Sequence, residues 1–120
     1  MPVSTGQIIR RTLEILGVVG AGQTVSAEDD RLVRETLTAA AATLAARGIV
    51  DVEADCAADA IPDDVVLPLA AVVARWAAPA YGFGGTDLAA LKMLADEAEA
   101  DLRSRPDTSG DPAPVRVKYF

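Results

Sequence analysis

Residues 65–81 read VVLPLAAVVARWAAPAY, and this apolar stretch decides the fold. Its length approaches that of a membrane span, but Arg75 lies inside it and Pro68 and Pro79 interrupt it. A central arginine is costly to insert into a bilayer, so a buried helix is the better interpretation. Apolar residues cover this helix nearly all round, which is typical of a central helix. The preceding residues 61–64, IPDD, predict its start, and Pro79 predicts its kink or end.

Three further helices are expected around this central one, over residues 4–16, 26–47 and 86–103. Apolar residues recur in each at helical spacing, and each is bounded by capping or turn residues. Residues 49–60 hold acids and alanines without a sustained period, so they predict a loop or a short irregular turn. The sequence therefore predicts an all-α protein, a small bundle of about four helices formed by residues 1–104.

Capping residues support these boundaries. Ser4 or Thr5 can cap the first helix, and Gly17 can take the left-handed conformation that closes it. Ser26 with Asp29 resembles a capping box in which Asp replaces the usual Glu. In the last helix the expected outward face consists of the acids Asp96, Glu97, Glu99 and Asp101, opposite the expected inward residues Leu88, Leu91, Ala95, Ala98 and Leu102.

The composition excludes several classes of protein. The chain has 120 residues, of which 51% are hydrophobic and 4% aromatic, so one domain with a modest, alanine-rich core is expected. Its 11 basic and 18 acidic residues give a net charge of −7, which disfavours a free-standing nucleic-acid binder. The chain has no histidine, so hydrolase triads and most zinc sites are disfavoured. One cysteine and an amino-terminal segment without signal-peptide character favour a reducing cytoplasm.

Two segments imitate ligand-binding motifs. Residues 17–24, GVVGAGQT, have the glycine spacing of a phosphate-binding loop, but Gln23 replaces the lysine and the loop follows a helix where the motif requires a strand. The acids Asp51, Glu53, Asp55 and Asp59 alternate as in a calcium loop, but Cys56 and Pro62 occupy the positions of the required Gly and Glu. An interhelical loop and a solvated acidic loop are the favoured interpretations.

Three other candidate groups have simple structural interpretations. Adjacent Asp63 and Asp64 suit a helix start better than a paired-carboxylate site. Cys56 has no neighbouring histidine or cationic cluster that would activate it, which predicts an inert thiol. Trp76 is expected in the core, with its indole N–H near an edge. No catalytic residue, cofactor or metal site is predicted.

The carboxyl-terminal residues 105–120 predict an extended arm, because three prolines, one glycine and small polar residues forbid a helix. Its end alternates apolar and basic residues before two aromatics: Val115, Arg116, Val117, Lys118, Tyr119 and Phe120. Such a segment suits strand addition to a partner, or docking of the aromatic side chains into a pocket. A disordered end is the alternative.

The order of these segments resembles the head-to-tail adaptor family of tailed bacteriophages and gene transfer agents. The resemblance covers the whole chain loosely and rests on short motifs in sequence order: Ile15-Leu16-Gly17, the loop Gly20 to Val25, Ser26-Ala27-Glu28, Ile61-Pro62, Ala80-Tyr81-Gly82, and an acidic last helix before the arm. Proteins of this family are small helical head-completion proteins that attach beneath the portal ring.

The resemblance implies a structural role in the virion at the head-tail junction, after synthesis in the host cytoplasm. It implies a ring of about twelve copies bound to the portal protein, extending the DNA channel and offering a platform for the stopper or tail protein. The arm would reach the portal or an adjacent copy. The acids Asp96, Glu97, Glu99 and Asp101 would face the channel, where a negative wall lets DNA slide without sequence-specific binding.

A second function remains open from the residues alone. The chain could be a small cytoplasmic helical binding or regulatory module that folds its carboxyl-terminal segment onto one partner. The two functions differ in stoichiometry, because an adaptor forms a cyclic assembly on a portal and a module binds one or two copies of a soluble partner.

Overall fold

A computed structural model describes residues 2–20 and 22–105 of the chain. Within these residues the elements follow one another as α1 (Thr5–Ile15), α2 (Ala27–Ala46), α3 (Asp51–Ala57), α4 (Asp63–Ala77), the short 3-10 helix η1 (Ala78–Tyr81) and α5 (Gly85–Arg103). The predicted all-α class is confirmed.

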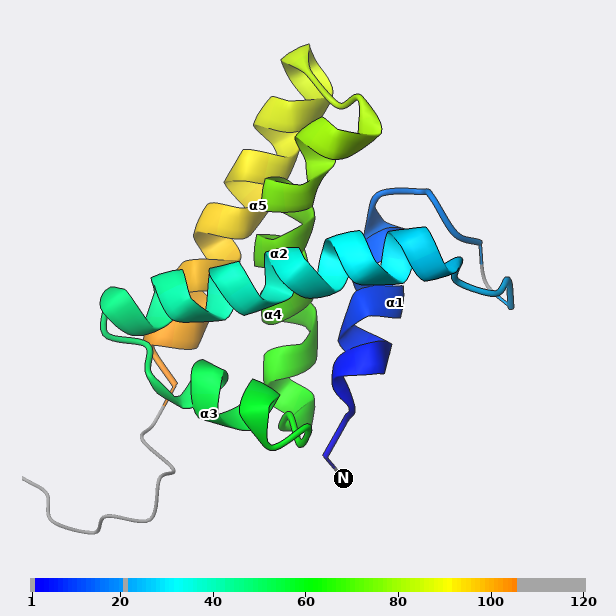
Figure 1. Ribbon diagram of the computed structural model, residues 1–120. Coiled ribbons are helices and arrows are strands. Elements are labelled where there is room, and N and C mark those ends of the chain that lie inside the picture. Colours follow the sequence, from blue (N-terminus) through cyan, green and yellow to red (C-terminus); the bar gives the residue numbers. More distant parts are fainter. Residues whose placement is uncertain (1, 21, 106–120) are drawn as a thin grey trace, which may run out of the picture.

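Helix α4 is the centre of the molecule, as its sequence predicts. It contacts α1, α2 and α5, and Figure 1 shows α2 crossing in front of it while α1 and α5 lie on its two sides. Its buried residues are Val65, Leu69, Ala70, Ala71, Val72, Val73, Ala74 and Ala77. By length and composition alone the stretch from Asp63 to Tyr81 could cross a membrane, but half of it is buried inside the molecule.

The two prolines of the central stretch have different effects. Pro79 ends α4 as predicted, because the chain tightens there into η1 and turns at Gly82, which has a φ of 82°. Pro68 lies inside α4 without ending it. An interior proline costs about 3 kcal/mol in a helix, and here the burial of neighbouring side chains such as Val65 and Leu69, both 0% exposed, opposes that cost.

The caps of the first two helices explain where they begin. Ser4 and Gln7 form a reciprocal capping box at α1, in which the Ser4 Oγ accepts from the Gln7 N–H and the Gln7 Oε1 accepts from the Ser4 N–H. At α2 the Ser26 Oγ accepts from the Asp29 N–H at 3.1 Å. The Asp29 carboxylate accepts from the Tyr81 hydroxyl at 2.8 Å, so it ties the start of α2 to η1.

The expectation of a loop over residues 49–60 is wrong, since this segment contains α3 and raises the number of α-helices in the described residues to five. The helix forms because Val52, 1% exposed, packs into the core beside Ile49, 7% exposed. The carboxylates of the acidic residues in its first turn interact favourably with the positive end of the helix dipole and so stabilise the helix. A seven-residue helix carries too few periodic positions to be recognised in sequence, and contact with α2 decides its conformation.

The amino-terminal segment is fastened to the chain that follows α3. Val3 and Ile61 form an isolated antiparallel bridge, with N–O distances of 2.7 and 2.8 Å. Beside it, the Asp59 carboxylate accepts from both the N–H and the hydroxyl of Thr5, at 2.7 and 2.8 Å. These bonds hold the pKa of Asp59 below its usual value and close the end of the bundle where α1 and α4 begin.

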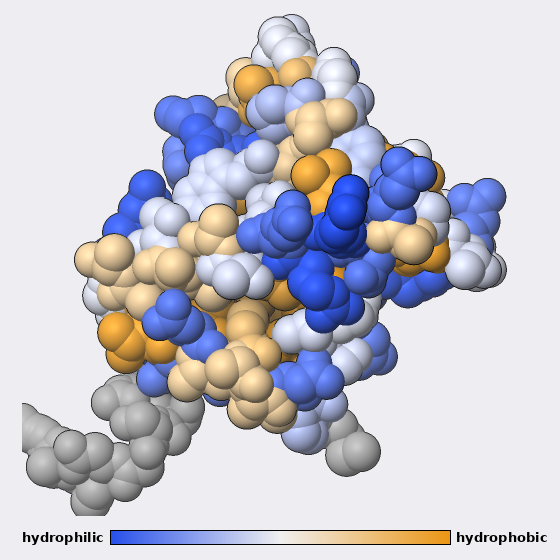
Figure 2. Space-filling view, viewed as in Figure 1, coloured by the Kyte–Doolittle hydropathy of each residue, from blue (hydrophilic) through white to orange (hydrophobic). Residues whose placement is uncertain are grey.

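The surface over α2 and α3 is divided by polarity. Figure 2 shows hydrophilic side chains gathered over α1 and the amino-terminal half of α2, and an apolar area over the carboxyl-terminal half of α2 and α3. The exposed apolar residues of these segments and of the turn between them are Ala42, Ala46, Val50, Ala54 and Ala57. A hollow of about 280 Å³ opens between α2 and α3, and Ala41, Cys56 and Ala57 are among the residues that line it.

Candidate interaction site around Trp76

The predicted arm residues Val115, Arg116, Val117, Lys118, Tyr119 and Phe120 lie outside the described residues. Arg105, the last described residue, donates two hydrogen bonds to the carboxylate of Asp64, at 2.8 and 3.3 Å. This pairing holds the pKa of Asp64 below its usual value. Arg105 therefore joins the end of α5 to the start of α4.

The four acids predicted on the outer face of α5 separate into two groups. Asp96, Glu97 and Asp101 are exposed. The Glu99 side chain is only 21% exposed and accepts from Arg47 at 2.6 Å and from Arg103 at 2.9 Å. The expectation that Glu99 points freely outward is therefore wrong, since this carboxylate joins the end of α2 to the end of α5.

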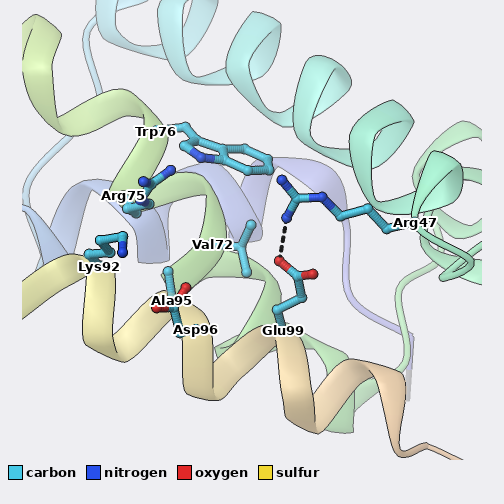
Figure 3. Close-up of a pocket in the computed structure, with 8 residues that line it drawn as sticks. All are labelled: Arg47, Val72, Arg75, Trp76, Lys92, Ala95, Asp96 and Glu99. Carbon is cyan, nitrogen blue, oxygen red and sulfur yellow. Dashed lines mark hydrogen bonds and ion pairs between the residues drawn. The ribbon is translucent and has the colours of Figure 1, made fainter.

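Trp76 is partly buried and packs against the main core, so its expected place in the core is confirmed in part, with one side of the residue left exposed. It emerges where α2, α4 and α5 meet, and Figure 3 shows its indole ring between these helices. The guanidinium carbon of Arg47 lies 5.7 Å from the ring centroid. Because Glu99 also holds this guanidinium, the arginine and the ring stabilise one arrangement at the junction.

A hollow of about 410 Å³ opens beside Trp76 between α4 and α5. We call it the Trp76 groove, and it is lined by Arg75, Trp76, Pro79, Gly85, Leu88, Ala89 and Lys92. The antiparallel pairing of α4 with α5 builds it, because the small residues Gly85 and Ala89 leave space that larger side chains would fill. Its floor is mostly apolar, and both charged side chains that line it are cations.

The two cations of the groove are unpaired. Across the described part of the chain, neither the Arg75 nor the Lys92 side chain makes a hydrogen bond or an ion pair, whereas Arg47 is held by Glu99. Figure 3 shows Arg75 and Lys92 next to Trp76 in an adjoining hollow, which Asp96 and Glu99 also line. An apolar hollow with two free positive charges can receive an apolar side chain flanked by carboxylates. Sequence reasoning missed this site, because Lys92 joins Arg75 only through the pairing of α4 with α5.

The remaining candidate groups have structural roles. Burial raises the pKa of Cys56 to about 11, with the nearby acids Asp55, Asp59 and Glu53 adding to the effect, so little thiolate is present at neutral pH. Gln23, which replaces the lysine of the phosphate-loop pattern, accepts from the Gly20 N–H through its own side chain at 2.7 Å. Over residues 2–20 and 22–105, no three His, Cys, Asp or Glu side chains gather in a way that could hold a metal ion.

Comparisons with known proteins identify no relative of this chain. No protein-family model, no curated protein and no solved structure matches this chain.

Proposed function

We propose that this protein is a structural head-to-tail adaptor of a tailed-phage or gene-transfer-agent particle. It binds below the portal ring as a cyclic oligomer, extends the DNA channel, and supports the stopper or tail protein, with no catalytic step. The resemblance in sequence motifs suggests this role. In support, the motifs lie at element boundaries: Leu16 and Gly17 close α1, Ser26 caps α2, and Pro62 precedes α4.

The observation that carries the proposal is the exposure of large apolar side chains on separate elements. Val50 before α3 is 61% exposed, Leu67 on α4 is 61% exposed, and Met93 on α5 is 69% exposed. A subunit of a ring on a portal needs contacts with two neighbours and with the portal, so it carries several apolar contact areas.

The charge distribution suits a DNA channel. The net charge is −7, and Asp96, Glu97 and Asp101 are exposed on one helix. Carboxylates on a channel wall repel phosphate, so DNA passes without adhering. Asp96→Lys should make particles retain or eject DNA abnormally, as measured by packaged DNA content and ejection rate. Particles of this variant that package and eject DNA normally would exclude a channel position for Asp96.

Electron microscopy tests the proposal as a whole. The protein is mixed with the portal ring from the same source and imaged beside the portal alone. An added layer of density below the portal, with cyclic symmetry, is expected. A portal without this layer, while the protein stays folded in solution, would contradict the adaptor function.

The Trp76 groove favours a second candidate function, a helical binding module for one soluble partner. One groove with two free cations fits one acidic segment. Stoichiometry separates the functions, because a module forms a complex with one or two copies of its partner and an adaptor forms a ring.

A further inference from the structure

Helix α5 carries an exposed ridge on the side turned away from the core. Residues at helical spacing share its outer face and are all exposed: Ala90, Met93, Leu94, Glu97 and Asp101. Met93 and Leu94 are 69% and 44% exposed, and they are large apolar side chains. We call this face the α5 ridge. It presents apolar side chains followed by two carboxylates.

The α5 ridge and the Trp76 groove are complementary in shape and in charge. The ridge projects two large apolar side chains, and the groove is an apolar hollow of about 410 Å³. Glu97 and Asp101 on the ridge are negative, while Arg75 and Lys92 on the groove are positive. Among the described residues none of these four side chains has an ion-pair partner within its own chain.

We propose that the α5 ridge of one copy docks in the Trp76 groove of the next copy. This inference rests on the proposed function, because it names the contact that joins neighbouring copies in the ring. Met93 is unbranched and flexible, and it fills the irregular hollow beside Trp76. The carboxylates of Glu97 and Asp101 then meet the free cations Arg75 and Lys92 at the edge of the contact. Of the acids Asp96, Glu97 and Asp101, this contact leaves only Asp96 for the channel wall.

The contact joins two different faces of the protein, the α5 ridge and the Trp76 groove, so the same contact can repeat from one copy to the next. Two ridges placed together bring carboxylates against carboxylates, and two grooves bring cations against cations, so both arrangements are repelled. Met93 and Lys92 are consecutive residues and point in different directions around α5. A copy that fills its neighbour's groove therefore keeps its own groove free for a third copy, and such contacts generate a ring when the rotation closes.

Disulfide trapping tests the contact directly. In a Cys56→Ser background, one chain carries Ala89→Cys in the groove and another carries Leu94→Cys on the ridge. Mixed under mild oxidation, alone and with the portal ring, the two chains should form a cross-linked pair, and neither should cross-link with itself. A chain with both substitutions should give a ladder of more than two copies. A matched control, Ala54→Cys on α3 mixed with Leu94→Cys, should not cross-link.

Cross-linking of either single variant with itself would contradict the proposal, because it indicates a symmetric pair. Absence of any ladder, both alone and on the portal, would also contradict it. The adaptor function can fail independently of this contact. If the cross-linked ladder forms but electron microscopy shows no added layer below the portal, the adaptor function is wrong and the contact between copies stands. If the added layer is seen but no cross-links form, the contact is wrong and the adaptor function stands.

Charge reversal, combined with the same cysteine pair, provides a second test. Arg75→Glu with Lys92→Glu in the groove, or Glu97→Lys with Asp101→Lys on the ridge, should each lower the cross-linking yield about tenfold. Mixing the two reversed chains should restore the yield, because each altered face then meets a partner of opposite charge. Reversed chains that cross-link as efficiently as the parent would contradict the charge pairing.

Discussion

Leu67 and Leu69 lie two residues apart on α4 and have opposite surroundings, since Leu67 is 61% exposed and Leu69 is 0% exposed. Leu69→Ala leaves a cavity in the core and should lower the free energy of unfolding by about 2–5 kcal/mol. Leu67→Ala is the matched control and should change it by less than about 0.5 kcal/mol. Urea unfolding followed by circular dichroism measures both values. Equal losses in the two variants would contradict the central position of α4.

Asp59 should make stability depend on pH. Its pKa is lowered by the hydrogen bonds from Thr5, so the ionised carboxylate stabilises the fold above the unfolded-state pKa. This stabilisation is lost as the pH falls through the folded-state pKa. Asp59→Asn should therefore be less stable at neutral pH and lose less stability on acidification below about pH 4.

Asparagine suits the Asp59 position, because this residue has a φ of 55° and asparagine tolerates the left-handed region. Thermal unfolding between acidic and neutral pH gives the comparison. An identical acid response in Asp59→Asn and the parent would show that Thr5 does not bind the ionised carboxylate.

At the level of elements, two glycines should respond oppositely to the same substitution. Gly48 ends α2 with a φ of 93°, which an alanine adopts only with strain, so Gly48→Ala should destabilise the protein by about 1 kcal/mol. Gly6 lies in the first turn of α1, where an added Cβ would be 3.7 Å from the Ser4 Oγ, an ordinary contact. Gly6→Ala should therefore stabilise it by about 0.5 kcal/mol. Chemical denaturation checks both signs.

The junction of α2, α4 and α5 should be visible in fluorescence, because Trp76 is the single tryptophan of the chain. Arg47→Ala removes the guanidinium from the ring and from Glu99, so water reaches the indole and the emission should shift to longer wavelength. The loss of stability should stay below about 1 kcal/mol, since the Arg47 side chain is 47% exposed. Arg31→Ala, an exposed position on α2, is the control and should leave the spectrum unchanged.

For the whole molecule, the helical body should fold without the arm. The buried side chains of both apolar clusters belong to residues 8–102. Removing residues 106–120 should leave the circular dichroism spectrum helical and the melting temperature within about 3 °C of the parent. The same deletion should abolish binding to the portal, measured by co-sedimentation. A truncated chain that binds at full strength would show that the arm has no part in attachment.

The sequence alone determined the helices whose signals are local. Ser4 and Ser26 cap α1 and α2, Gly48 ends α2, and Pro79 ends α4, because a cap or turn depends on a few neighbouring residues. The all-α class and the central position of α4 follow in the same way from apolar periodicity. The phage adaptor function, the arm and its partners remain proposals.

Only the tertiary structure decided the features that join distant residues. Helix α3 forms against α2, the Glu99 carboxylate binds Arg47, and Trp76 packs against the core while it also lines a surface groove. These features depend on which helices pack together and on their rotation about their axes. Periodicity gives the face that each helix buries, but not the neighbour that it meets, because the hydrophobic effect that drives the packing is non-directional.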